Sequence, residues 1–147
     1  MTVHVIATGG TIASLADPVT GAVRPAVSAD DLVAGIPGID RFSPRVEELA
    51  YVNGWNVTPE VMLAVAARAQ AAADDDSVAG IVVTHGTDTI EETAFLVDLL
   101  VQSDKPIAFA AAMRSGGEIA ADGPRNLLNA AGLAASPDAR GLGAVLV

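Results

Sequence analysis

The chain has 147 residues, of which 51% are hydrophobic and 3% aromatic, and it carries a formal net charge of −10. The length suits a single domain with a core of aliphatic residues and alanine. The negative charge argues against nucleic acids and anionic membranes as binding partners, because proteins bind both through lysine and arginine. Because the sequence has no cysteine, disulfides, thiolate catalysis and cysteine metal sites are excluded.

Short apolar runs alternate with helical patterns along the chain, and this alternation is typical of βαβ units in a parallel sheet. Ser28 and Thr58 are suitable N-caps for the first two helices, and Pro59 suits a first helical position. Residues 15–27 contain two prolines and several small polar residues, so we expect a mobile loop there. In chain order, the predicted elements are strand 3–7, helix 28–35, strand 46–52, helix 58–73, strand 79–83, helix 90–101, strand 107–111, helix 122–135 and strand 143–147.

The chain contains two histidines, His4 and His85, and neither belongs to a cluster spaced for metal binding. No apolar run approaches the roughly 20 residues needed to span a bilayer. The N-terminus also has no basic stretch followed by an apolar one, as a signal peptide would have. We therefore expect a cytoplasmic protein that binds no metal and no membrane, and we interpret His85 as a hydrogen-bonded structural residue.

Two polar, threonine-bearing turns follow two of the predicted strands. The first covers residues 7–14, with the sequence ATGGTIAS, and the second covers residues 84–89, with the sequence THGTDT. Ligands in open α/β sheets bind beyond the carboxyl ends of the strands, where the strand order reverses. Two such turns meeting there would form a small polar pocket that contains Thr11, Thr87 and Asp88.

Each turn also has a simpler interpretation. The glycines before Thr11 allow positive φ and close backbone approach, which suits a presented nucleophile, a phosphate-binding loop or a plain turn. Asp88 and Glu91 have the spacing of a capping box for the helix that follows. The same geometry offers backbone N–H groups at Thr87 to an oxyanion, and the Asp88 carboxylate to a ligand ammonium.

Four stretches together resemble the bacterial-type L-asparaginase family, which includes asparaginases and glutaminases. They cover almost the whole chain, in the order that the family has. The resemblance implies the N-terminal domain of such an enzyme. We therefore predict a flavodoxin-like α/β fold with three layers, in which helices cover both faces of an open, mainly parallel sheet. The stretches are Thr8-Gly9-Gly10-Thr11-Ile12-Ala13, Thr84-His85-Gly86-Thr87-Asp88-Thr89-Ile90-Glu91-Glu92-Thr93-Ala94, Ala112-Met113-Arg114 and Ala121-Asp122-Gly123-Pro124.

The resemblance implies hydrolysis of L-asparagine to L-aspartate and ammonia, without a metal or an organic cofactor. Thr11 is the implied nucleophile that forms an acyl-enzyme. Thr87 and Asp88 are implied members of a second catalytic group of the family, which is built around a threonine. Asp88 also holds the substrate ammonium. The loop after Thr11 is the implied lid, and a homotetramer is implied for the full-length form. The implied substrate contacts are Gly54, Trp55, Thr87, Asp88 and Ala112.

Relatives within the family imply two alternatives, namely L-glutamine as substrate or the ammonia-releasing subunit of a tRNA-dependent amidotransferase. The negative charge counts against direct contact of this chain with tRNA. Residues 12–30 lack the tyrosine that family members commonly have in the lid. Gly54 and Trp55 stand where serine and glutamine are frequent, and Trp55 is interpreted as a pocket wall or a core aromatic. The only lysine, Lys105, precedes a predicted strand, at the wrong end of the sheet for the site.

The last predicted strand reaches the final residue of the chain. We therefore expect residues 1–147 to be an incomplete asparaginase N-terminal domain, from which the C-terminal domain and the expected lysine are absent. A non-catalytic interaction module is the alternative from another functional class. Arg114 and Arg125 are interpreted as anchors for loops or a helix end that assist a carboxylate only secondarily.

Overall fold

Two neighbouring parallel strands, β1 (Thr2–Gly9) and β5 (Val78–Thr84), form the centre of the computed structural model, which describes residues 2–147. Their apolar residues run almost without interruption, because both faces of the sheet are covered. β4 (Arg45–Val52) pairs with β1, while β6 (Ile107–Ala110) and then β7 (Ala144–Leu146) follow β5, all in parallel. The order β4-β1-β5-β6-β7 is the flavodoxin-like order, so the predicted fold class is confirmed.

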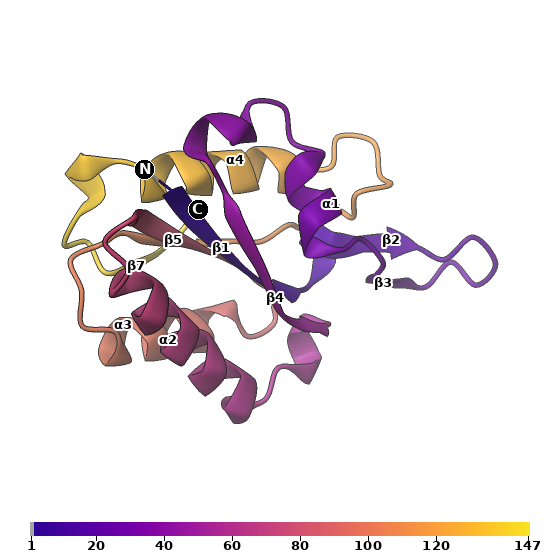
Figure 1. Cartoon of the computed structure of the whole chain (residues 1–147). Coiled ribbons are helices and arrows are strands. Elements are labelled where there is room, and N and C mark those ends of the chain that lie inside the picture. Colours follow the sequence, from indigo (N-terminus) through magenta and orange to yellow (C-terminus); the bar gives the residue numbers. More distant parts are fainter. Residues whose placement is uncertain (1) are drawn as a thin grey trace.

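Helices cover both faces of the sheet and complete the three predicted layers (Figure 1). On one face, α2 (Pro59–Ala73) and α3 (Ile90–Leu100) pack over the buried side chain of Phe109. On the other face, α1 (Ala29–Ala34) and α4 (Gly123–Ala134) enclose a second apolar cluster. The core therefore consists of two aliphatic layers, one on each side of a single sheet.

The predicted caps are confirmed for two helices and wrong for a third. Ser28 Oγ accepts a hydrogen bond from the backbone N–H of α1 at 3.1 Å, and Thr58 Oγ1 does the same for α2 at 3.5 Å. α3 instead begins after Thr89, whose side chain makes no capping bond. The capping box expected from Asp88 and Glu91 is absent because the helix starts one residue later than that motif requires.

The expected mobile loop 15–27 is instead an antiparallel hairpin of β2 (Ser14–Ala16) and β3 (Val23–Pro25). The Asp17 carboxylate closes its turn by accepting two backbone N–H groups, at 3.0 and 2.8 Å, and by pairing with the Arg24 guanidinium. These donors hold the pKa of Asp17 well below its ordinary value. The hairpin projects from the body of the molecule (Figure 1).

Four short 3₁₀ helices were not expected from the sequence. Two of them, η1 (Thr11–Ala13) and η3 (Gly54–Asn56), directly follow the ends of β1 and β4. The others are η2 (Ile39–Phe42) and η4 (Pro137–Ala139). None of the helices in residues 2–147 combines the length and the apolar character that crossing a bilayer would require.

β5 and α4 are packed closely against each other at Gly80. A Cβ atom added there would lie 2.0 Å from the carbonyl oxygen of Ala134, so this contact admits only glycine. Gly132 lies on the same helix, but a Cβ there would meet nothing closer than the ring of Phe42, at 3.8 Å. The two glycines therefore provide a matched pair for testing the helix-to-sheet packing.

We expect Gly80→Ala to lower the free energy of unfolding by about 3 kcal/mol, because the helix must move away from the strand. Gly132→Ala should raise it by up to about 1 kcal/mol, because alanine favours a helix interior. Urea unfolding of the two variants measures both values, and equal stability of the two variants would contradict the packing described here.

Candidate functional site

The polar turns predicted from the sequence meet at the point where the strand order reverses. From β1 the sheet extends to β4 on one side and to β5 on the other. The segments that leave the carboxyl ends of these three strands therefore gather at one edge, which is the usual ligand site of this topology. They are η1, η3 and residues 85–89.

Three glycines bring these segments into backbone contact. A Cβ on Gly10 would lie 2.6 Å from the backbone nitrogen of Gly86, and a Cβ on Gly86 would lie 2.5 Å from Cα of Gly54. A Cβ on Gly54 would lie 2.5 Å from Oδ2 of Asp88. Since real Cβ atoms do not approach backbone so closely, only glycine at positions 10 and 86 allows the three segments to pack in this way, and glycine at position 54 leaves room for the Asp88 carboxylate. We call this arrangement the glycine stack.

The glycine stack places the predicted reactive groups on neighbouring segments. Thr11 is half-buried and opens η1 directly after Gly10, whose φ of 77° is in the left-handed region. Thr87 and Asp88 are exposed and follow Gly86. Within residues 2–147, the two threonine hydroxyls and the Asp88 carboxylate make no hydrogen bond to another protein group, so their polar atoms are available to a ligand.

The predicted substrate contacts lie around the same edge. Gly54 is buried within the glycine stack, whereas the Trp55 side chain is 66% exposed, which excludes the core interpretation of this aromatic. Ala112 is buried beyond the end of β6. Ala112 and Thr87 line a pocket of about 180 Å³, which we call the Thr87 pocket.

Two positioning contacts at this edge were not anticipated from the sequence. Thr89 Oγ1 donates to the carbonyl oxygen of Gly54 at 2.9 Å and thereby ties η3 to the segment after β5. Asn126 Nδ2 donates to the carbonyl oxygen of Ala111 at 2.9 Å and orients the chain next to Ala112. Both bonds join residues far apart in the sequence, and no local spacing signals them.

His85 has the structural role that the sequence indicated. It is fully buried, with Nδ1 2.8 Å from the carbonyl oxygen of Gly86 and Nε2 3.0 Å from the hydroxyl of Thr93. Burial lowers the pKa of the imidazole because it disfavours the charged form. Nδ1 donates to Gly86, because a carbonyl oxygen only accepts, and Nε2 faces the Thr93 hydroxyl, which also contacts the carbonyl oxygen of Thr89 at 3.0 Å. These contacts tie the second polar turn to α3.

Lys105 lies at the opposite end of the sheet, as predicted. It precedes the amino end of β6, and its Nζ donates to the carbonyl oxygen of Asp75 at 2.7 Å. Tyr51 lies in β4 and is 44% exposed. In residues 2–147, no group of three or more His, Cys, Asp or Glu side chains is arranged to hold a metal ion.

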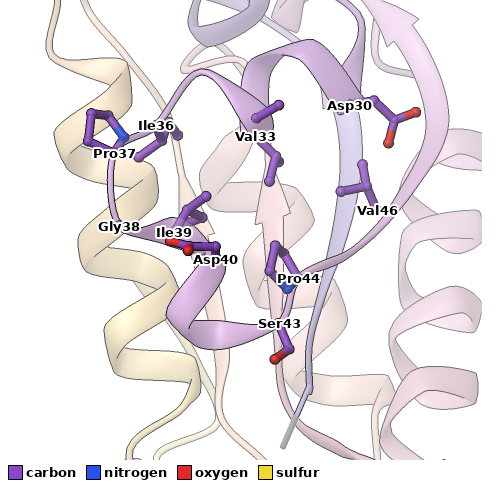
Figure 2. A pocket seen from close by; sticks show the side chains of 11 residues that line it. Asp30, Val33, Ile36, Pro37, Gly38, Ile39, Asp40, Ser43, Pro44 and Val46 are labelled. Carbon is purple, nitrogen blue, oxygen red and sulfur yellow. The ribbon is translucent and has the colours of Figure 1, made fainter.

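A cavity larger than the Thr87 pocket lies remote from these residues. It has a volume of about 660 Å³ and lies between α1, η2 and the amino end of β4. Figure 2 shows mainly aliphatic side chains facing it, among them Val33, Ile39 and Val46. None of the predicted site residues lines this cavity, so cavity size does not identify the functional site here.

Comparison with known proteins gives consistent matches over the whole described chain. The chain matches the family described as "Asparaginase, N-terminal" over residues 2–147. It is 38% identical to L-asparaginase 2 of Bacillus subtilis (strain 168), in a match that covers 99% of this chain and 40% of that protein. It is 40% identical to a glutaminase-asparaginase of Pseudomonas fluorescens biotype A, with 98% of this chain and 41% of the relative covered.

A solved structure agrees with the sequence matches. The probable cytoplasmic L-asparaginase from Campylobacter jejuni superposes with a TM-score of 0.87 at 34% identity, over 99% of this chain and 43% of that one. The chain therefore spans 40 to 43% of the length of these three relatives.

The burial of His85 generates a prediction about pH. The unfolded chain binds a proton on this imidazole near its ordinary pKa of 6.5, whereas the folded protein, with its lowered pKa, does not. Stability therefore rises with pH through this range, and His85 costs up to about 1.4 kcal/mol per pH unit as the pH falls below 6.5.

We expect the stability advantage of the wild-type chain over a His85→Gln variant to shrink between pH 7.5 and pH 5. Urea unfolding at both pH values measures the difference, and the comparison cancels the carboxylates that both proteins share. An advantage that grows toward pH 5 would mean that the folded protein stabilises the imidazolium instead.

Proposed function

The chain belongs to the asparaginase family and matches its N-terminal domain, and we propose that it forms the nucleophile-bearing part of an amidohydrolase that converts L-asparagine to L-aspartate and ammonia. The observation that carries the proposal is the glycine stack, through which Thr11 and the Thr87–Asp88 turn lie on touching backbone segments. The names of the relatives support the substrate class, since they are asparaginases or glutaminase-asparaginases.

In the proposed reaction, the Thr11 hydroxyl oxygen attacks the side-chain amide carbon of asparagine. The bond between that carbon and nitrogen then breaks, and the nitrogen leaves as ammonia with the proton that the hydroxyl gave up. Water hydrolyses the resulting ester, releases aspartate and restores the hydroxyl. The position of Thr11 directly after a strand end, with a hydroxyl that no other described protein group binds, supports this role.

The remaining site residues bind and orient the substrate in this proposal. The Asp88 carboxylate pairs with the α-ammonium, and Thr87 contributes its hydroxyl and backbone N–H to the reacting end. Gly54 and Trp55 flank the α-carboxylate, and the exposed indole forms a wall of the site. Ala112 lines the Thr87 pocket together with Thr87. The hydrogen bond from Asn126 to the carbonyl oxygen of Ala111 holds the peptide next to Ala112 in place.

Thr11 also needs a proton acceptor, and Lys105 does not supply it because its Nζ lies at the amino end of β6. We propose that residues 1–147 are an incomplete N-terminal domain and that further chain provides the lysine and a C-terminal domain. The coverage of 40 to 43% of the relatives' length supports this reading.

We propose a cytoplasmic location and a homo-oligomer for the full-length form. The C. jejuni relative is described as a probable cytoplasmic enzyme, which supports the location. Phe95 and Leu99 lie one turn apart on α3 and are 65% and 64% exposed, which supports an interface on that helix.

L-Glutamine is a second candidate substrate, and it rests on a specific observation. The P. fluorescens relative, at 40% identity, is a glutaminase-asparaginase. Because the two amides differ by one methylene group, the pocket alone discriminates between them by a factor of about 10 to 200. A rate on asparagine that exceeds the rate on glutamine supports the first candidate.

To test the reaction, residues 1–147 can be joined to the C-terminal part of the B. subtilis relative and assayed for ammonia release from both amides. We expect Thr11→Ala to reduce hydrolysis at least about 1,000-fold, because the nucleophile is lost. Asp88→Asn should chiefly raise KM, because the carboxylate charge that binds the ammonium is removed.

Thr2→Ala is the matched control, since it removes a threonine hydroxyl at the amino end of β1, whereas Thr11 follows the carboxyl end of that strand. This variant should keep the wild-type rate. Hydrolysis that survives Thr11→Ala would contradict the assignment of Thr11 as the nucleophile.

A further inference from the structure

A second polar pocket lies beside the candidate site. It has a volume of about 460 Å³ and is lined by Met113, Arg114, Ala120, Ala121, Asp122 and Arg125. We call it the arginine pocket. Two of its lining residues, Met113 and Asp122, also line the Thr87 pocket. The two pockets are therefore neighbours at the carboxyl edge of the sheet, with Met113 and Asp122 between them.

The arginines of this pocket differ from most others in the protein. Four arginines form ion pairs with carboxylates, whereas Arg114 and Arg125 form none among residues 2–147, although the chain carries a net charge of −10. The ion-paired arginines are Arg24, Arg45, Arg68 and Arg140. Two guanidinium groups that form no ion pair therefore line one pocket of an acidic chain, together with the Asp122 carboxylate.

The carboxylates nearest to these arginines are already engaged elsewhere. Asp122 accepts the backbone N–H groups of Met113 and Arg114, at 3.0 and 2.9 Å. Glu118 accepts the backbone N–H and the hydroxyl of Ser115, at 2.8 and 2.9 Å. These donors, with a smaller contribution from the positive charge of Arg114, hold the pKa of both carboxyl groups below the usual values. Among residues 2–147, neither carboxylate forms a hydrogen bond or an ion pair with Arg114 or Arg125, so most of the guanidinium donors remain available.

The expected anchoring role holds for only one of the two arginines. Arg114 Nη1 lies 3.4 Å from the carbonyl oxygen of Ala120, a long contact that leaves its other donors unused. Arg125 makes no hydrogen bond to another protein group within residues 2–147.

The backbone of the pocket is also strained. Ala120 has a positive φ of 61°, a conformation that costs energy in any residue with a Cβ atom. Strain of this kind persists where the surrounding structure imposes it, and it is concentrated at ligand-binding segments. Here the strained residue is Ala120, which lines the pocket and whose carbonyl oxygen faces Arg114.

We propose that the arginine pocket binds a small carboxylate anion between Arg114 and Arg125. A guanidinium group presents paired N–H donors that match the two oxygens of a carboxylate. Phosphate also offers paired oxygens, but the Asp122 carboxylate in the pocket lining would repel its double negative charge more strongly than the single charge of a carboxylate. The pocket therefore favours a carboxylate with a single charge. This inference does not depend on the proposed hydrolysis.

The test is a titration of the ¹⁵N-labelled 147-residue chain with sodium acetate at constant ionic strength, followed by NMR. We expect saturable shifts of the amide signals of Ala120, Ala121 and Arg125. Arg114→Gln and Arg125→Gln should each weaken acetate binding at least tenfold. A parallel titration with inorganic phosphate at pH 8 should give weaker binding than acetate.

Arg41→Gln is the matched control, because it removes the same charge from an exposed arginine that stacks on Phe42, away from the pocket. Its acetate affinity should equal that of the wild-type chain. The proposal is overturned if the wild-type signals do not saturate, or if Arg41→Gln loses as much affinity as the pocket variants. Tighter binding of phosphate than of acetate would overturn the choice of a carboxylate.

Discussion

The candidate site depends on one steric constraint, the backbone contact of Gly10, Gly86 and Gly54. Each of these glycines follows a different strand, and each lies where a Cβ atom would meet another segment at 2.5 or 2.6 Å. The close approach brings the turn that carries Thr11 against the turn that carries Asp88. A methyl group at Gly10 or Gly86 would push the backbone segments apart, and one at Gly54 would displace the Asp88 carboxylate. The geometry of the site therefore depends on the absence of side chains at these positions.

The sheet supplies the rigid base for this contact. β1 and β5 pair in parallel over nearly their whole length, and aliphatic layers on both faces hold them in register. Because neighbouring strands end at the same edge, their exit turns meet without a long connection. Two long-range hydrogen bonds then orient the periphery, from Thr89 to Gly54 and from Asn126 to Ala111.

The regular elements could be predicted from the sequence because their signals are local. Apolar runs marked the five parallel strands, and Ser28 and Thr58 marked two helix starts that the structure confirms. The hairpin in the expected loop 15–27 was missed because the Asp17 carboxylate stabilises it through bonds to nearby backbone and to Arg24, which no apolar pattern reveals.

The sequence named the polar residues that the structure brings together at the candidate site, whose catalytic roles stay a proposal, but it did not reveal the contacts that hold their segments in place. Thr11, Thr87 and Asp88 stood out as polar groups after apolar runs, and the structure brings their segments together. The capping role of Asp88 failed because α3 begins one residue later. Thr89 contacts a residue 35 positions away, and the sequence carries no periodicity over such a distance.

The most direct measurement of the central claim is the affinity for L-aspartate, the proposed product, in a Gly86→Ala variant. Gly86 has no positive φ, so alanine there changes only the space between the segments. NMR titration of the wild-type, Gly86→Ala and Gly132→Ala chains, followed at the amide signals of Thr11, Thr87 and Asp88, should show tenfold or greater loss of affinity in Gly86→Ala alone. Wild-type affinity in Gly86→Ala would contradict the claim that the glycine stack builds the site.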